Sequence, residues 1–71
     1  MEYELYKLYL EKYNGYWDSE DYTNADEVYN AIENADGNKY CWYIVIGYSK
    51  YTPNTLAQGE IKRKDYTRKR K

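Results

Sequence analysis

Residues 39–51 read KYCWYIVIGYSKY and contain the longest apolar run of the chain. β-Branched and aromatic side chains dominate this run, a composition that favours a strand largely buried on both faces. Strand alternation would place Tyr40, Trp42, Ile44, Ile46 and Tyr48 on one face, and Cys41, Tyr43, Val45 and Gly47 on the other. We expect this segment to be the central strand of an antiparallel sheet.

Another strand is expected downstream of this run. Residues 51–54, Tyr-Thr-Pro-Asn, favour a turn, because proline suits a turn position and breaks a strand. Residues 55–63 then fit a last strand whose apolar members are Leu56, Ala57, Gly59 and Ile61. Small side chains in that strand predict close approach by the helix or by a neighbouring backbone.

Residues 2–13 are compatible with two structures. Four residues from Tyr3 to Tyr13 have helical spacing, whereas the density of tyrosine favours a strand. The Asn14-Gly15 pair is typical of a two-residue hairpin turn, and aromatic residues resume directly after it. The strand is therefore the favoured interpretation, with residues 16–22 as a short second strand or an irregular return.

Residues 24–35 predict a helix. Thr23 or Asn24 can cap its N-terminus, and acidic residues near the start suit the helix dipole. Its apolar stripe consists of Ala25, Val28, Tyr29, Ile32 and Ala35. The Asp36-Gly37 pair is expected to end the helix, since glycine adopts the left-handed conformation without penalty.

These segments predict an α+β fold. We expect two layers, with one helix at about residues 24–35 packed on a three- to four-stranded antiparallel sheet. A single domain is expected over residues 1–61, followed by a basic strand end or tail over residues 62–71. The expected core consists of Val28, Ile32, Trp42, Ile44, Ile46 and Ile61.

The composition excludes several classes of function. The chain has 71 residues, no histidine and a single cysteine, Cys41. Cys–His nucleophile pairs and zinc sites built from cysteine and histidine are therefore excluded. One cysteine also cannot make an internal disulfide framework. Because Cys41 lies between two aromatic residues of the apolar run, we expect it to pack rather than to react.

Carboxylates are the remaining catalytic candidates. Asp18, Glu20 and Asp21 cluster before the predicted helix. Paired-carboxylate catalysis needs a deep cleft, which so small a chain cannot wall off, and the cluster lacks the spacing of a calcium loop. We therefore expect no catalytic residue, metal site or cofactor, and interpret the cluster as a solvated acidic segment or a docking surface.

The net charge of −1 conceals a strong asymmetry. Residues 1–36 carry ten acids and two bases, a net charge of −8. Residues 37–71 carry nine bases and two acids, a net charge of +7. Such a division predicts either two oppositely charged faces or an acidic body with a basic tail.

Aromatic content points to binding. The chain has twelve tyrosines and two tryptophans, more rings than a core of this size can bury. Exposed tyrosine and tryptophan are typical anchors of protein interfaces. We expect a protein partner with a basic site, bound through Tyr16, Trp17, Asp18, Glu20, Asp21 and Tyr22.

The basic C-terminal segment supports an alternative function. Its side chains could contact the phosphates of a nucleic acid, with one tyrosine available to stack on a base. These residues are Lys62, Arg63, Lys64, Tyr66, Arg68, Lys69, Arg70 and Lys71. Self-association through aromatic strand edges is a third possibility.

In kind, the chain is similar to small phage or mobile-element inhibitors such as anti-CRISPR and other anti-defence proteins, a similarity of type that no specific motif carries. The favoured hypothesis is a non-enzymatic module that occludes a site on a larger, nucleic-acid-handling protein. No apolar run approaches the ~18 residues of a membrane span, and the start lacks the basic region of a signal peptide. We expect a cytoplasmic location, in the host cell if the protein is phage-encoded.

Overall fold

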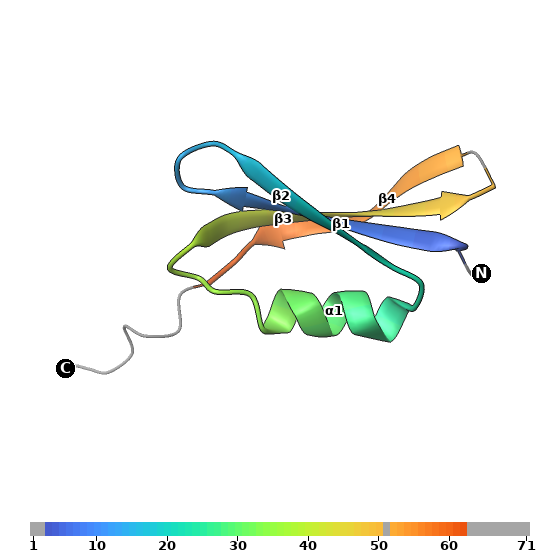
Figure 1. Ribbon diagram of the computed structural model, residues 1–71, viewed down its shortest axis with the longest axis horizontal. Coiled ribbons are helices and arrows are strands. Elements are labelled where there is room, and N and C mark those ends of the chain that lie inside the picture. Colours follow the sequence, from blue (N-terminus) through green and yellow to red (C-terminus); the bar gives the residue numbers. More distant parts are fainter. Residues whose placement is uncertain (1–2, 51, 63–71) are drawn as a thin grey trace.

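A computed structural model of the chain describes residues 3–50 and 52–62 (Figure 1). The elements in chain order are β1 (Leu5–Lys12), β2 (Trp17–Tyr22), α1 (Ala25–Glu33), β3 (Tyr40–Ser49) and β4 (Thr52–Glu60). All neighbouring strands are antiparallel, in the order β2-β1-β3-β4, and α1 lies against one face of the sheet. The predicted two-layer α+β fold is confirmed.

The N-terminal segment is a strand and lies in the middle of the sheet. β1 pairs with β2 through a hairpin and with β3 on its other side. The Lys12 N–H donates to the Tyr16 carbonyl at 2.8 Å, and the Gly15 N–H donates to the Lys12 carbonyl at 3.0 Å. Gly15 has a φ of +93°, which favours glycine. The hairpin loop therefore has three residues, 13–15, rather than the predicted two.

The core lies between α1 and the two central strands. Leu8 of β1 is paired with Val45 of β3, and both are almost completely buried beneath Val28 of α1. Tyr6 is also buried, and half-buried residues from every element pack around this centre. Ile32 belongs to that half-buried shell, and Ile61 is buried.

The predicted core is wrong at Trp42, Ile44 and Ile46. Their cross-strand partners in β1 are Glu11, Tyr9 and Lys7, which alternate with the buried Tyr6 and Leu8 and so point away from the helix. The predicted alternation of β3 is correct from Trp42 to Tyr48, but α1 covers the other face. Tyr40, which was expected to share the face of Trp42, instead lies on the side of α1, because the register shifts between Glu11 and Lys12. The physical reason is that side chains from other elements complete a buried layer on that face: Val28 packs with Val45, and Tyr3 and Leu56 fill the space above Gly47.

The helix begins as predicted and ends earlier. The Asn24 side-chain oxygen accepts hydrogen bonds from the Asp26 N–H at 2.7 Å and the Glu27 N–H at 3.4 Å. At the other end, the Asn34 side-chain amide donates to the Asn30 carbonyl at 3.0 Å. The Asn34 backbone N–H donates to the same carbonyl, and the next N–H, of Ala35, turns to the Ile32 carbonyl at 3.2 Å. This tighter last turn ends α1 at Glu33, before the predicted Asp36-Gly37 terminus.

The expected turn at Pro53 is also wrong. β4 starts at Thr52, which pairs with Ser49, and Pro53 pairs with Tyr48 inside the strand. β4 is an edge strand, where proline is tolerated because an N–H on the outer side has no ladder partner. Lys50 has a φ of +59°, so the chain reverses earlier than predicted.

Small residues in β4 were expected to allow close approach by the helix or a backbone. At Gly59 it is a side chain that approaches: the Tyr43 hydroxyl would lie 3.2 Å from a Cβ added there. Ala57 packs against the core. In the described ranges, no helix is both long enough and apolar enough to cross a membrane.

Candidate binding surface

Two exposed aromatic residues mark the β1–β2 hairpin. Tyr16 is 72% exposed and Trp17 is 44% exposed. Trp17 begins β2 opposite Glu11, on the sheet face that points away from α1. Trp17 therefore does not close the core, and its ring is available to a partner.

The six predicted partner-binding residues share one edge of the sheet and divide between its two faces. Asp18, Glu20 and Tyr22 pair with Leu10, Leu8 and Tyr6, on the side of α1. Trp17 and Asp21 lie on the opposite side, and Tyr16 precedes the strand. We call this set the acidic edge: Tyr16, Trp17, Asp18, Glu20, Asp21 and Tyr22.

Asp18 is held by two neighbours. The Tyr40 hydroxyl donates to its Oδ2 at 2.6 Å, and the Lys12 Nζ lies 3.3 Å from its Oδ1. The hydrogen bond from Tyr40, assisted by Lys12, lowers the pKa of Asp18, and the same bond raises the pKa of Tyr40. Sequence reasoning missed Tyr40, because its position depends on a register shift between Glu11 and Lys12 that no motif signals.

Glu20 and Asp21 have different partners. The Tyr22 hydroxyl donates to Glu20 Oε1 at 2.6 Å, an interaction that raises the pKa of Tyr22 to about 12. On the other face, the Lys7 Nζ lies 3.4 Å from Asp21 Oδ1, and the bond to Asp21 raises the pKa of Lys7. Both acids are exposed, as the sequence predicted.

The Glu20–Tyr22 contact predicts a late-titrating phenol. The unfolded chain releases this proton near pH 10 and the folded chain near pH 12. The stabilisation is therefore complete below pH 10 and is lost as the pH rises to about 12. Ultraviolet titration of Tyr22→Phe should lack a late phenolate step, and Glu20→Gln should move that step to lower pH. Titration curves of Glu20→Gln and wild type that coincide would contradict the contact.

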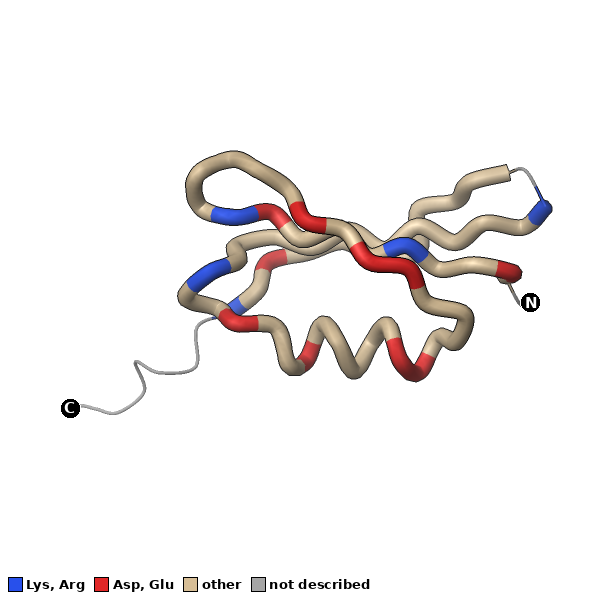
Figure 2. Tube along the Cα trace, in the orientation of Figure 1, with Lys and Arg blue, Asp and Glu red and all other residues tan. Residues whose placement is uncertain are grey.

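A groove of about 420 Å³ separates β2 from α1. Leu8, Leu10, Ala31 and Ala35 supply apolar walls, and Asp18, Glu20 and Asp36 supply carboxylates. Residues 13–38 contain seven acids and no lysine or arginine, and Figure 2 shows these acids following β2 and α1. The β2–α1 side of the molecule is therefore acidic.

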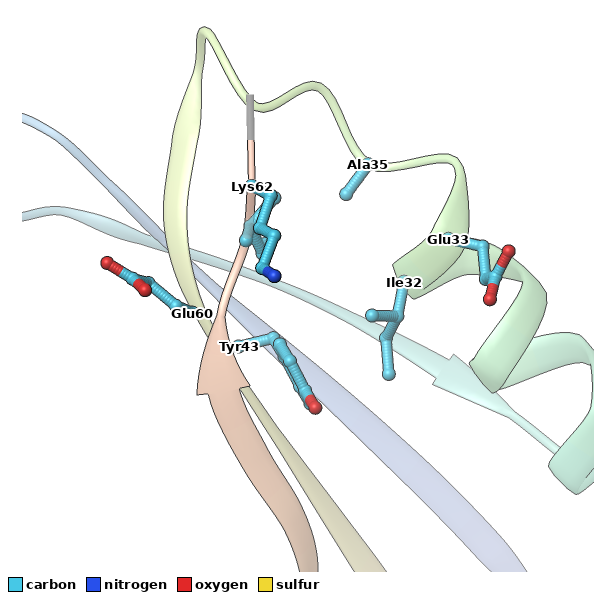
Figure 3. A pocket seen from close by; sticks show the side chains of 7 residues that line it. Ile32, Glu33, Ala35, Tyr43, Glu60 and Lys62 are labelled. Atoms are coloured by element: carbon cyan, nitrogen blue, oxygen red, sulfur yellow. The ribbon is translucent and has the colours of Figure 1, made fainter. Parts of the chain in front are cut away.

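A second groove, of about 340 Å³, lies between α1 and the β3–β4 hairpin (Figure 3). Ile32 and Tyr43 line its apolar part, and Lys62 borders it together with Glu33 and Glu60. Of the predicted nucleic-acid contacts, Lys62 is the one that the structure describes. The others lie outside the described residues: Arg63, Lys64, Tyr66, Arg68, Lys69, Arg70 and Lys71.

Cys41 is half-buried, and its Sγ–H donates to the Glu11 carbonyl at 3.5 Å. Over the described residues, no three acidic or cysteine side chains are grouped closely enough to hold a metal ion. The geometry thus provides an acidic surface with exposed aromatic rings. The chain matches no protein-family model, no curated protein and no solved structure.

Proposed function

We propose that this protein is a non-enzymatic binding module that occludes a basic site on a larger, nucleic-acid-handling protein. The observation that supports it is the pair of exposed rings, Tyr16 and Trp17, at the tip of an acidic edge strand. Trp17 lies outside the hydrophobic core cluster. Tryptophan is also among the residues most enriched in binding hot spots.

The charge distribution suggests the chemistry of the partner. Lys12 and Lys7 pair with Asp18 and Asp21, while the segment from residue 13 to residue 38 has no base of its own. The resulting negative potential attracts basic surfaces and repels phosphate. Proteins that hold nucleic acid have basic grooves, because they must neutralise phosphates. Such a groove is the complement of the acidic edge.

The groove between β2 and α1 fits this partner in shape as well as in charge. Lysine and arginine have long aliphatic stems and charged heads. The half-buried Leu10 and Ala31 form apolar walls that suit the stem, and the carboxylates of Glu20 and Asp36 suit the head. A basic side chain of the partner can therefore enter beside the aromatic tip. The proposed site of action is the cytoplasm, that of the host if the protein is phage-encoded.

The first test is truncation of Trp17. Immobilised protein is incubated with nuclease-treated lysate, captured proteins are quantified, and the affinity of the captured partner is then measured directly. Trp17→Ala should lose about 2 kcal/mol or more, roughly thirtyfold in affinity, without lowering the melting temperature. The matched control is Tyr29→Ala, because Tyr29 is 42% exposed on α1, close to the 44% of Trp17. Equal loss in both variants would contradict an anchor at Trp17.

The second arm reverses charge at Glu20→Lys with Asp21→Lys. Both positions are exposed, and exposed ion pairs contribute about 0–1 kcal/mol, so the fold should tolerate the change. Binding to the captured protein should weaken, mainly through slower association, and the difference should fade with added salt. If the reversal instead strengthened binding to DNA or RNA and left protein capture unchanged, the nucleic-acid alternative would replace the proposed function.

A further inference from the structure

The sheet face opposite α1 is apolar over its two central strands. Cross-strand pairing gathers Leu5 and Tyr9 of β1 with alternate residues of β3 on this side: Trp42, Ile44, Ile46 and Tyr48. All of these are half-buried by their neighbours on the sheet. No element among the described residues covers them, since α1 lies on the other side (Figure 1). We call this side the open face.

Polar groups on the open face lie beside its apolar centre or at its ends, and the flanking strands add Ser19, Gln58 and Thr55 next to the central rows. Burial raises the pKa of Tyr9, and the neighbouring Tyr48 phenol raises it further. Lys7 is paired with Asp21 towards the β2 edge. Glu11 and Glu60 flank Trp42 at one end. The centre of the open face, around Ile44 and Ile46, thus presents mainly aromatic rings and aliphatic side chains.

The charges of the open face disfavour a nucleic acid. Rings on two central strands could stack on bases, but stacking requires a basic groove for the backbone. Lys7 is already paired with Asp21, and Glu11 and Glu60 add further negative charge. The C-terminal residues 63–71 are also unsuitable to cover this apolar face, because seven of the nine are charged and only Tyr66 is aromatic.

We propose that a second copy of this chain packs on the open face, with the two sheets face to face around a two-fold axis. Sheets pack in this way about 10 Å apart, with their strands nearly aligned. A two-fold interface places the same patch on both sides, so an apolar centre meets an apolar centre. Each copy then contributes the same apolar surface to the interface.

The register shows that such a dimer is self-complementary. With the axis across the strands, between the rows of Ile44 and Ile46, Ile46 faces the second copy's Ile44. In the same arrangement Tyr48 faces the second copy's Trp42. Glu60 then lies opposite Pro53 of the second copy. Glu11 lies opposite Leu5 of the second copy, next to that copy's Lys7. No carboxylate of one copy therefore faces a carboxylate of the other.

The size of the open face predicts weak association. Four strands about 4.8 Å apart, with about 20 Å between Trp42 and Tyr48, give roughly 400 Å² per copy, or about 800 Å² in total. Stable interfaces bury about 1,200 Å² or more. The dimer should therefore form as the protein concentration rises. It leaves the acidic groove between β2 and α1 uncovered, but it covers Trp17, which lies opposite Glu11 on the open face, so a partner bound at Trp17 competes with it.

Sedimentation equilibrium of the full chain, from low micromolar to millimolar concentration, tests this proposal. The average mass of wild type should rise towards two chains. Ile44→Thr with Ile46→Thr keeps β-branched side chains but removes apolar surface, and this variant should stay at one chain. Tyr29→Ala, exposed on α1, is the control and should associate like wild type. No partner is needed, so failure here leaves the proposed binding function untouched.

Concentration-dependent NMR shifts locate the contact even if the double variant folds poorly. Shifts confined to the open face, including the Trp42 indole, would support the dimer. A wild-type mass of one chain throughout, or shifts confined to α1, would overturn it. Shifts of the open face on adding a single-stranded oligonucleotide, without self-association, would also overturn it and identify a nucleic acid as the occupant.

Discussion

Leu8→Ala is expected to cost about 2–5 kcal/mol of unfolding free energy, the largest loss from a single truncation in this domain. Leu8 is 1% exposed, between Val45 of β3 and Val28 of α1. Truncation leaves a cavity at the centre of the core, which the strands and the helix cannot close without moving apart. Since domains are stable by about 5–15 kcal/mol in total, much of the protein should unfold at ordinary temperature. Urea unfolding followed by circular dichroism measures the loss.

The matched control is Ile44→Ala. It removes a side chain of the same size from the neighbouring strand, but from the open face, where Ile44 is half-buried. Its cost should be less than half that of Leu8→Ala when both are measured at low protein concentration, where the chain is a monomer. An equal cost for the two substitutions would mean that the helix covers both faces equally, contrary to the described packing.

Local signals in the sequence were sufficient for most of the elements. Asn24 caps the helix because its side chain fits the first free N–H groups, and the Asn14-Gly15 pair permits the hairpin. The alternation of residues 42–48 was also predictable, because strand geometry fixes it, but the face of Tyr40 was not. Because both sides of this strand are apolar, its sequence does not indicate which side packs against the helix. That choice depends on how Val28 packs against Leu8 and Val45, which are distant in sequence.

The candidate surface was predictable in its residues but not in its arrangement. Exposure of Tyr16 and Trp17 follows from their place beside the hairpin turn. Division of the acids between two faces follows from alternation once residues 17–22 form a strand. The bond between Asp18 and Tyr40 does not follow from either segment, because the register shift at Glu11 and Lys12 positions Tyr40. Local composition carries no information about such a shift.

Gly47→Val is the second substitution with a large expected cost, about 3 kcal/mol. Gly47 is a buried residue of β3, on the side of α1. A Cβ at this position would lie 2.8 Å from Cγ of Tyr3 and 2.8 Å from Cδ1 of Leu56. The leucine methyl can rotate away, but the Tyr3 ring can yield only by moving as a whole. Its edge-to-face contact with Tyr6, at 5.9 Å between ring centroids, would then be lost.

A graded series separates this packing effect from the general effect of removing a glycine. Gly47→Ala should cost less than Gly47→Val, because alanine adds only the Cβ and not the two further methyl groups that valine would force into the same space. Gly59→Ala should be close to neutral, since its nearest contact is the Tyr43 hydroxyl at 3.2 Å, the far end of a side chain. Combining Gly47→Val with Tyr3→Ala should cost less than the sum of the two single changes, because Tyr3→Ala removes the ring that obstructs the valine. Strictly additive urea-unfolding energies would show that Tyr3 does not pack on Gly47.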